Sequence, residues 1–567
     1  MTPRAKLALA AVSVAFAAAD TYVVVLALPD MMTGVGLSAD QLQRAAPIIS
    51  GFLLGYIAVL PLIGRIADVV GRTPVLVAAL LLFAVGSLIT AAAYDLPLVV
   101  TGRFLQGVGG GGLVPATLAL VADLWPANKR GLPLGVVGAV QELGSVLGPL
   151  LGAAVLAVSD WRAIFWLNLG VALVLALFLR GFRERLRNPL AVVLGVLAGI
   201  SLALTLIAPV RLATDVTLGL PFVPFAGSES RLATPIGLVT LALAAGWAVA
   251  ASWRGRAGAR DVLRQVDLPG ALLLALALAG VVLAFATADP ERELMSPAGP
   301  WLLLAALVFA LAFWWWQRRT PQAIVPPGLL APRAAWGSLA VSFLVGAALI
   351  AALVDVPVFA RTTQGGGQLA AALVLLRFLV ALPLGAVAGG WLTRRVGLAP
   401  ITFGGLALTG AMFVLMARWD RDALDGIAAT VVLALCGFGF GLAISPVNSA
   451  ILAATRADTH GLVSALVVVA RMIGMLVGIS ALTAIGLRRY YALADDVPPP
   501  EQVCTGGAGI CREYVDALRD AAIAQSSAIF AGAAVCAFAA AVLGLLLLGR
   551  RPVGDSDHGD IPSARVP

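Results

Sequence analysis

The chain has 567 residues, of which 60% are hydrophobic and only 12% are charged, and its formal net charge at pH 7 is +8. A soluble chain of this length would form several domains with polar surfaces, so the composition excludes an ordinary soluble protein. No basic stripe is interleaved with aromatic residues, so the charge does not indicate nucleic-acid binding.

Repeated apolar runs of about 18–25 residues predict an all-α polytopic membrane protein, because a helix of this length crosses a ~30 Å hydrocarbon core. Strands are not expected, because the runs do not alternate and open strands would leave backbone groups unpaired in lipid. We count sixteen candidate spans, at residues 6–30, 45–64, 74–93, 97–122, 131–157, 161–180, 189–210, 234–252, 268–287, 301–317, 336–357, 368–391, 399–417, 427–452, 460–495 and 515–549.

The basic residues set the orientation of these spans. All of them are arginines except Lys6 and Lys129, and they gather in alternate loops. By the positive-inside rule, both termini are expected in the cytoplasm. The first run has small residues like those of a signal-peptide cleavage site, but it continues through "TYVVVLALP" and is long enough to span, so we expect it to be retained.

Arginine-rich and proline-rich connectors divide the spans into groups. We expect a six-helix bundle at 1–188, an extra helix pair at 189–253, a linker pair at 254–335, a second six-helix bundle at 336–550 and a disordered cytoplasmic tail at 551–567. A faint repeat supports paired halves, because the loops "GRIADVVGR" (64–72) and "GGWLTRRVG" (389–397) both carry a short basic turn that ends in glycine. Arg394 of the second copy stands where the first has Asp68. Paired halves are common in secondary transporters.

The fifteenth span is longer than a bilayer requires. A continuous helix from Gly461 to about Ala494 would measure ~50 Å at 1.5 Å per residue, and the segment 511–527 is amphipathic. We expect a periplasmic helical hairpin at about 485–525, with an ordinary ordered loop as the alternative. Cys504 and Cys511 lie there, where an oxidising compartment permits a disulfide. Two cysteines without a nearby histidine do not make a metal site.

Four ionisable residues lie deep within the spans, namely Asp20, Glu142, Arg377 and Arg471. An Asp, Arg or Lys costs roughly 2.5–3.5 kcal/mol at mid-span on insertion scales, so such residues usually face a partner or water. A carboxylate whose salt bridge exists in only one conformation couples proton occupancy to conformation. We hypothesise this role for Asp20 and Glu142; a permanent ion pair that fixes helix register is the alternative.

Glycine patterns mark two further segments. In "GSVLGPLLGA", Gly144, Gly148 and Gly152 form a face that permits close helix contact, and Pro149 can bend the helix.

In "GRIADVVGR", Gly64 and Gly71 are expected in tight turns. Asp68 can accept hydrogen bonds from a neighbouring helix N-terminus and pair with Arg65 or Arg72. A merely solvated loop is the alternative.

These motifs, together with "RFLQG" (103–107) and "DWRAIFWLN" (160–168), resemble the signature set of major facilitator superfamily drug/proton antiporters. The resemblance covers both halves, and the pair at 268–317 is similar to the linker helices of the fourteen-helix branch. The pair at 189–252 departs from that branch and takes no family role. The segments "DTYVVV", "QELGSVLGP", "LVDVPVF" and "VVVARMIGML" are similar to the mycobacterial lipid-exporting members.

The resemblance implies a major facilitator fold in a bacterial inner membrane, with loop 64–72 as a latch of the outward-facing state. It also implies triacylglyceride export with a periplasmic lipid-binding lipoprotein, and some drug tolerance. Because the first and fourth helices of that fold line one cavity, Asp20 is paired with Arg103. Glu142 is paired with Arg471 on the same resemblance, while Arg377 stays open as its partner.

The sequence therefore predicts a proton-coupled exporter of lipids or lipophilic drugs that works by alternating access without a cofactor. A multidrug antiporter with no lipid role is the close alternative. An intramembrane lipid-modifying enzyme is disfavoured, because His460 and His558 are the only histidines and no catalytic set is evident. "GGGG" (109–112) is followed by no Lys-Ser/Thr, so it is not a nucleotide-binding loop. Four buried ionisable groups disfavour a scaffold or sensor.

Overall fold

The structure is a computed structural model that describes residues 2–37, 42–180, 189–209, 212, 220–225, 231, 233–253, 267–286, 296–320, 323–364, 368–393, 395–498 and 511–549. Within these ranges every regular element is a helix. Each predicted span coincides with one α-helix, or in the second case with two helices separated by a bend. Twelve of the described helices are long and apolar enough to cross a membrane, and the bent pair raises the number to thirteen. The all-α polytopic architecture is thereby confirmed.

The first six spans form the N-terminal bundle. They are α1 (Pro3–Gly34), α2 (Leu42–Ala58) with α3 (Leu60–Val70), α4 (Arg72–Ala91), α5 (Leu96–Leu124), α6 (Gly131–Val158) and α7 (Trp161–Arg180). The bend between α2 and α3 is 41°. The start of α5 is set by Asp95, whose Oδ1 accepts a 2.9 Å hydrogen bond from the Leu98 N–H and so satisfies a free donor of the first turn.

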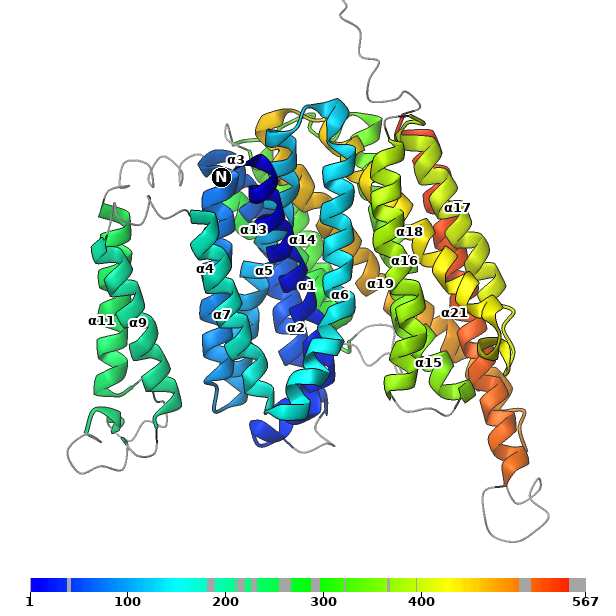
Figure 1. Ribbon diagram of the computed structural model, residues 1–567, viewed down its shortest axis with the longest axis horizontal. Coiled ribbons are helices and arrows are strands. Elements are labelled where there is room, and N and C mark those ends of the chain that lie inside the picture. Colours follow the sequence, from blue (N-terminus) through cyan, green and yellow to red (C-terminus); the bar gives the residue numbers. More distant parts are fainter. Residues whose placement is uncertain are drawn as a thin grey trace, which may run out of the picture.

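Two helix pairs follow. The pair α9 (Pro189–Ile207) and α11 (Pro235–Trp253) stands apart from the bundle and reaches it through α4 (Figure 1). The pair α13 (Leu268–Ala286) and α14 (Gly299–Gln317) is tied at one end by Asp267, which accepts hydrogen bonds from Trp316 Nε1 at 2.8 Å and Gln317 Nε2 at 2.7 Å. Because α13 packs against α2 and also α19, this pair contacts both halves of the molecule.

The last six spans form the C-terminal bundle. They are α15 (Arg333–Gln364), α16 (Gln368–Leu392), α17 (Leu398–Met416), α18 (Ile427–Ala453), α19 (His460–Ala494) and α21 (Arg512–Leu547). Pairs such as α16–α18 and α17–α18 pack closely, as do α15–α19 and α15–α21. A buried aromatic cluster holds the outer end of the bundle together, with Phe359 of α15 packed 5.4 Å from Trp419 and 6.4 Å from Phe530 of α21, measured between ring centroids.

A long helical hairpin leaves this bundle. α19 and α21 have 35 and 36 residues, and their paired ends project past the neighbouring helices, on the side away from the chain's N-terminus (Figure 1). Arg421, between α17 and α18, holds the base of the hairpin through a 2.7 Å hydrogen bond from its Nε to Asp520 Oδ1. That hydrogen bond, ahead of the nearby carboxylate charges, raises the pKa of the Arg421 guanidinium.

The cysteines fall into two kinds. Cys511, next to the start of α21, is disulfide-bonded, whereas Cys436 and Cys536 are free thiols within α18 and α21. Cys504 and the tail at 551–567 lie outside the described residues.

The internal repeat is visible in the backbone. Gly71 and Gly397 have φ values of 101° and 92°, the left-handed region that favours glycine, and each directly precedes the first residue of a helix, α4 or α17. The expectation of a loop at 64–72 is wrong, however. α3 continues through Val70, because its apolar residues recur at helical spacing, and only Gly71 interrupts the chain before α4. Arg394, in the second copy, is outside the described residues.

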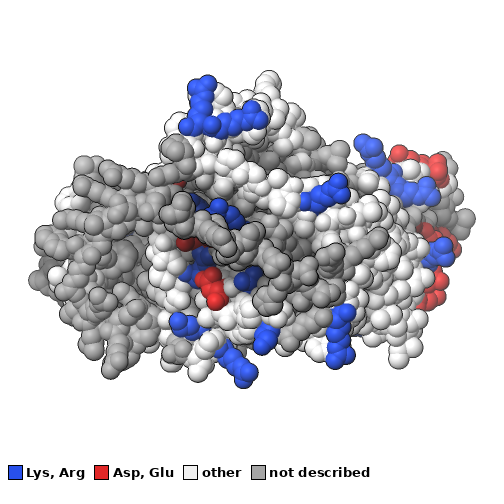
Figure 2. All heavy atoms as spheres, turned by 90° about the horizontal axis from the view of Figure 1, so that it is seen from above, with Lys and Arg blue, Asp and Glu red and all other residues white. Residues whose placement is uncertain are grey.

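The two bundles meet at their cytoplasmic ends, where α3 contacts α19 and α6 contacts α16. Glycines bring α6 and α16 into backbone contact, since a Cβ on Gly135 would collide with the Ala386 carbonyl and one on Gly390 with the Gly131 carbonyl. Ser445 Oγ also donates a 2.8 Å hydrogen bond to the Gly131 carbonyl. Toward the opposite end α6 and α16 separate (Figure 1). Figure 2, seen from above, shows basic side chains at several points around the upper face, with some acidic side chains among them.

Candidate functional site

The glycine face of α6 packs against α1. A Cβ on Gly144 would collide with the Ala15 carbonyl and one on Gly148 with the Ala19 carbonyl, so the two backbones are in contact. Gly152 is buried as well, and α6 is continuous through Pro149. This packing carries Asp20, the residue after Ala19, into the interior of the N-terminal bundle.

Asp20 and Arg103 form a buried ion pair. Arg103 Nη1 lies 2.6 Å from Asp20 Oδ2, and the two side chains are 1% and 0% exposed. Asn168 donates to the other carboxylate oxygen, and Arg103 also donates to Gln106 Oε1 at 3.0 Å. The guanidinium lies 4.4 Å above the Phe52 ring. All of these residues belong to one bundle, so rocking the bundles against each other would leave this network together.

Replacing Arg103 by Met is expected to lower the free energy of unfolding by about 3–5 kcal/mol, because Asp20 would remain buried without its cation. Thermal unfolding of purified protein, followed by intrinsic fluorescence, measures the change. The double variant Asp20→Asn/Arg103→Met should recover part of the loss, because its amide carries no charge. Unfolding of Arg103→Met at the wild-type temperature would contradict the prediction.

A second carboxylate, Glu142, faces the other bundle. Glu142 Oε1 on α6 lies 3.9 Å from Arg471 Nη1 on α19, and the side chains are 9% and 13% exposed. Tyr56 of α2 is buried close enough to both for electrostatic interaction. α15 fixes the depth of Arg471, since a Cβ on Gly346 would collide with the Arg471 carbonyl. This ion pair therefore crosses the boundary between the bundles.

Arg377 does not join Glu142. It lies on α16, and its Nη1 donates a 3.0 Å hydrogen bond to Thr430 Oγ1 on α18, within the C-terminal bundle. Among the described residues it forms no ion pair.

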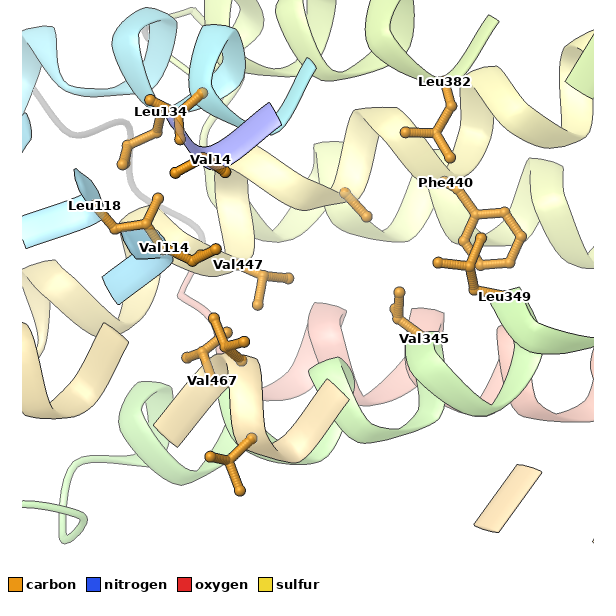
Figure 3. Packing of buried hydrophobic residues seen from close by; sticks show 14 of the residues in the cluster. Val14, Val114, Leu118, Leu134, Val345, Leu349, Leu382, Phe440, Val447 and Val467 are labelled. Carbon is orange, nitrogen blue, oxygen red and sulfur yellow. The ribbon is translucent and has the colours of Figure 1, made fainter. Parts of the chain in front are cut away.

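A cavity of about 30 Å³ lies between the bundles beside the Glu142–Arg471 pair. Its walls come from α5, α6, α15, α18 and α19, and they are mainly apolar, with Arg471, Gln141, Ser342 and Asn448 as the polar members. Figure 3 shows the apolar lining, in which Val114 and Leu118 of one bundle face Val447 and Val467 of the other. In the described conformation this space has room for about one water-sized molecule, so it is its mainly apolar lining that bears on the class of substrate.

The polar contacts between the cytoplasmic ends of the two bundles centre on Asp68. Its Oδ1 accepts a 2.8 Å hydrogen bond from the Gly461 N–H, and its Oδ2 accepts a 2.9 Å bond from the Leu462 N–H, both at the start of α19. Arg72 Nη1 lies 2.6 Å from Asp68 Oδ1, and Arg72 Nη2 donates to the Ala457 carbonyl at 3.4 Å. A carboxylate at a helix N-terminus is favoured by the free N–H groups and by the helix dipole.

Gly64 does not occupy the tight turn that was expected from the sequence. It is helical, and a Cβ there would lie 2.6 Å from the Gly461 carbonyl, so its role is close approach of α3 to α19. Gly71, by contrast, does occupy the turn. Arg65 is half-buried, and its Nε has no hydrogen-bond partner among the described residues; the ion pair to Asp68 comes from Arg72.

Two buried polar residues of the spans were not selected as site residues from the sequence. Tyr56 shows no distinguishing sequence pattern, since its place beside Glu142 depends on the packing of α2. Asp355 is only 6% exposed on α15, and its signal was available, because "LVDVPVF" is an apolar run broken by one carboxylate.

Comparisons with known proteins assign the chain. Residues 10–189 match the Major Facilitator Superfamily. A triacylglyceride transporter of Mycolicibacterium hassiacum is 38% identical over 557 residues, which cover 95% of this chain and 91% of that protein. The chain belongs to the major facilitator superfamily. The triacylglyceride transporter of Mycobacterium tuberculosis strain H37Rv is 35% identical over 581 residues, covering 99% of this chain and 97% of that protein.

Solved structures agree with the major facilitator fold. A human organic anion transporter superposes with a TM-score of 0.54 at 15% identity, covering 97% of this chain and all of that chain (100%). A proton:xylose symporter superposes with a TM-score of 0.55 at 14% identity, covering 97% and 96% of the two chains. The chain is thus a multi-pass plasma-membrane protein of the major facilitator superfamily, and its relatives' names indicate a transporter rather than an enzyme.

Proposed function

We propose that the chain is a proton-coupled exporter that moves triacylglyceride-like lipids, and other lipophilic molecules, out of the inner membrane by alternating access. The observation that carries the proposal is the Glu142–Arg471 ion pair, which joins the two bundles beside an apolar cavity. Protons supply the energy, and no metal or cofactor is needed.

The pair provides the coupling because its members move with different bundles. In the described conformation the bundles are joined at their cytoplasmic ends, so a proton would reach Glu142 from the periplasmic side. A neutral Glu142 loses most of its attraction for Arg471, and the bundles are then free to rock. Release of the proton to the cytoplasm restores the charge and the pair.

Asp20 has weaker support as a coupling group. Its partners Arg103, Asn168 and Gln106 form one network inside the N-terminal bundle. A coupling role would require a change within that bundle, so this geometry favours the alternative, a permanent pair that holds α1, α5 and α7 in register.

A lipid substrate is supported by the apolar lining of the cavity and by the names of the relatives. The projecting hairpin of α19 and α21 supports hand-over to a periplasmic lipid-binding lipoprotein, because a lipid leaving the bilayer needs a shielded path or a receiving protein. A multidrug antiporter would use the same cavity and coupling pair but would have no need of the hairpin.

Flux into liposomes tests the proposal. Purified protein is reconstituted, and transport of labelled triacylglyceride and of a cationic dye is followed with and without a pH gradient. We expect both fluxes, with the gradient accelerating them. Dye flux without lipid flux would favour the multidrug antiporter, and chemical conversion of the lipid would favour an enzyme.

A hairpin deletion separates lipid from drug transport. We expect a chain lacking about residues 488–520 to lose lipid export and to keep dye efflux, because the bundles and their cavity remain. Equal loss of both activities would count against a hairpin role specific to lipid.

A further inference from the structure

Asp355 is a buried carboxylate without a hydrogen-bond or ion-pair partner in the described part of the chain. It lies on α15, nine residues before the last residue of the helix, Gln364, and it is 6% exposed. Among the described residues no hydrogen bond or ion pair reaches it. An ionised carboxylate is costly inside a membrane unless a cation or several donors compensate it.

The neighbours of Asp355 are apolar and aromatic. Phe359 is one helical turn further along the same face, and it packs against Phe530 of α21 and against Trp419. Gly337 on α15 is packed against Leu547 of α21. Asp355 is therefore placed on the side of α15 that turns toward α21, next to the aromatic cluster at the base of the hairpin.

The charged groups of the elements packed against α15 are engaged elsewhere or exposed. Arg377 of α16 donates to Thr430, and Arg471 of α19 faces Glu142. α18 has no charged residue. The remaining charges are His460, Arg488 and Arg489 of α19, Asp425 of the short helix Ala423–Asp425, and Arg512, Glu513, Asp516, Arg519 and Asp520 of the first turns of α21.

Among the described residues, none of these groups makes a hydrogen bond or an ion pair with Asp355. The neutral, protonated form is the one that this environment accommodates. The two carboxylates beside arginines, Asp20 and Glu142, are in the opposite situation, because each has a cation to stabilise its charge.

We propose that Asp355 is a proton-binding site of the C-terminal bundle, a buried carboxyl group that holds a proton in the described conformation. For a proton-coupled exporter, the consequence is that the carrier binds a proton at Asp355 in addition to the one exchanged at Glu142. Only this consequence rests on the proposed function. The burial of Asp355 and the absence of an ion-pair partner among the described residues do not depend on that function.

Infrared spectroscopy of the full-length protein in liposomes at neutral pH tests the site directly, through the carbonyl absorption of protonated carboxyl groups. We expect Asp355→Asn to remove part of this absorption. Asp20→Asn is the matched control and should leave it unchanged, because the Asp20 carboxylate lies 2.6 Å from the Arg103 guanidinium, which compensates its charge. An unchanged absorption in Asp355→Asn would overturn the proposal.

Labelling of aspartate with ¹³C covers the case in which Asp355→Asn does not fold. In the wild-type protein, the label should shift part of the protonated-carboxyl absorption, and the same shift should persist in Asp20→Asn. Absence of a shifted component would show that no aspartate is protonated and would overturn the site.

The flux measurement is independent of the spectroscopic one. If the Asp355 absorption is present and transport ignores the pH gradient, the proposed function fails and the site stands. If transport follows the gradient and the absorption is absent, the site fails and the proposed function stands.

Discussion

Replacing Asp68 by Asn is expected to shift the carrier away from the conformation in which the cytoplasmic ends are joined. The carboxylate now accepts two hydrogen bonds from the first turn of α19 and pairs with Arg72. An amide presents only one acceptor oxygen, and its NH₂ group would face an N–H donor. Each hydrogen bond to a charged group contributes about 1.5–3 kcal/mol, so the loss of one of them corresponds to a shift on the order of 10- to 150-fold.

Distances between spin labels at Asn128 and Arg395, which are exposed at the cytoplasmic ends of the two bundles, measure this shift. The free cysteines Cys436 and Cys536 are replaced by Ala in the labelled background. Asp123→Asn is the matched control, because Asp123 approaches Arg72 at 3.4 Å and makes no contact with the start of α19. A distance distribution of Asp68→Asn identical to that of the control would contradict the latch.

Glu142→Gln is expected to remove the response of lipid export to a pH gradient. The amide cannot lose a proton, so the link between protonation and the Arg471 contact is broken, and Gln resembles the protonated state permanently. Coupling energies between sites commonly correspond to factors of about 5–150, so gradient-driven flux should fall on the order of 10- to 100-fold. Exchange of labelled for unlabelled substrate, which needs no net proton movement, should persist.

The flux assay in liposomes measures both quantities. Glu142→Asp is the matched variant, since it keeps the titratable group on a shorter side chain and should retain part of the response. Gradient-driven export at the full wild-type rate in Glu142→Gln would remove Glu142 from the coupling mechanism and leave the ion pair as a structural link.

The helices could be predicted from sequence because each span is a long apolar run with polar ends, and length alone separates it from the connectors. The bend at Val59 and the continuation of α3 to Val70 were not predicted, because "GRIADVVGR" has the glycines and charges of a turn. The helical period of its apolar residues was visible in the sequence. Whether the segment folds as a helix or as a turn, however, depends on α19, which packs on it from almost four hundred residues further along the chain.

Depth in the membrane could be predicted for the charged residues, whereas their partners could not be predicted from the residues alone. Asp20 and Arg103 were matched through the resemblance to a family whose first and fourth helices are neighbours. For Glu142, the same reasoning left Arg377 open, and only the packing of α16 on α18 shows that Arg377 reaches Thr430. Asp355 has no ion-pair partner among the residues that the structure describes, so a search of the sequence for ion pairs does not identify it.

The contact between Gly64 and Gly461 has a consequence for repeated cycling. Where two helices touch through bare backbone, no long side chain has to be trapped in a single rotamer each time they come together, so the entropy lost on closure is small. A backbone contact of this kind can open and re-form without any side chain having to return to a particular rotamer. Bulkier residues there would make one half of the cycle slow, even in a carrier whose charges were all intact.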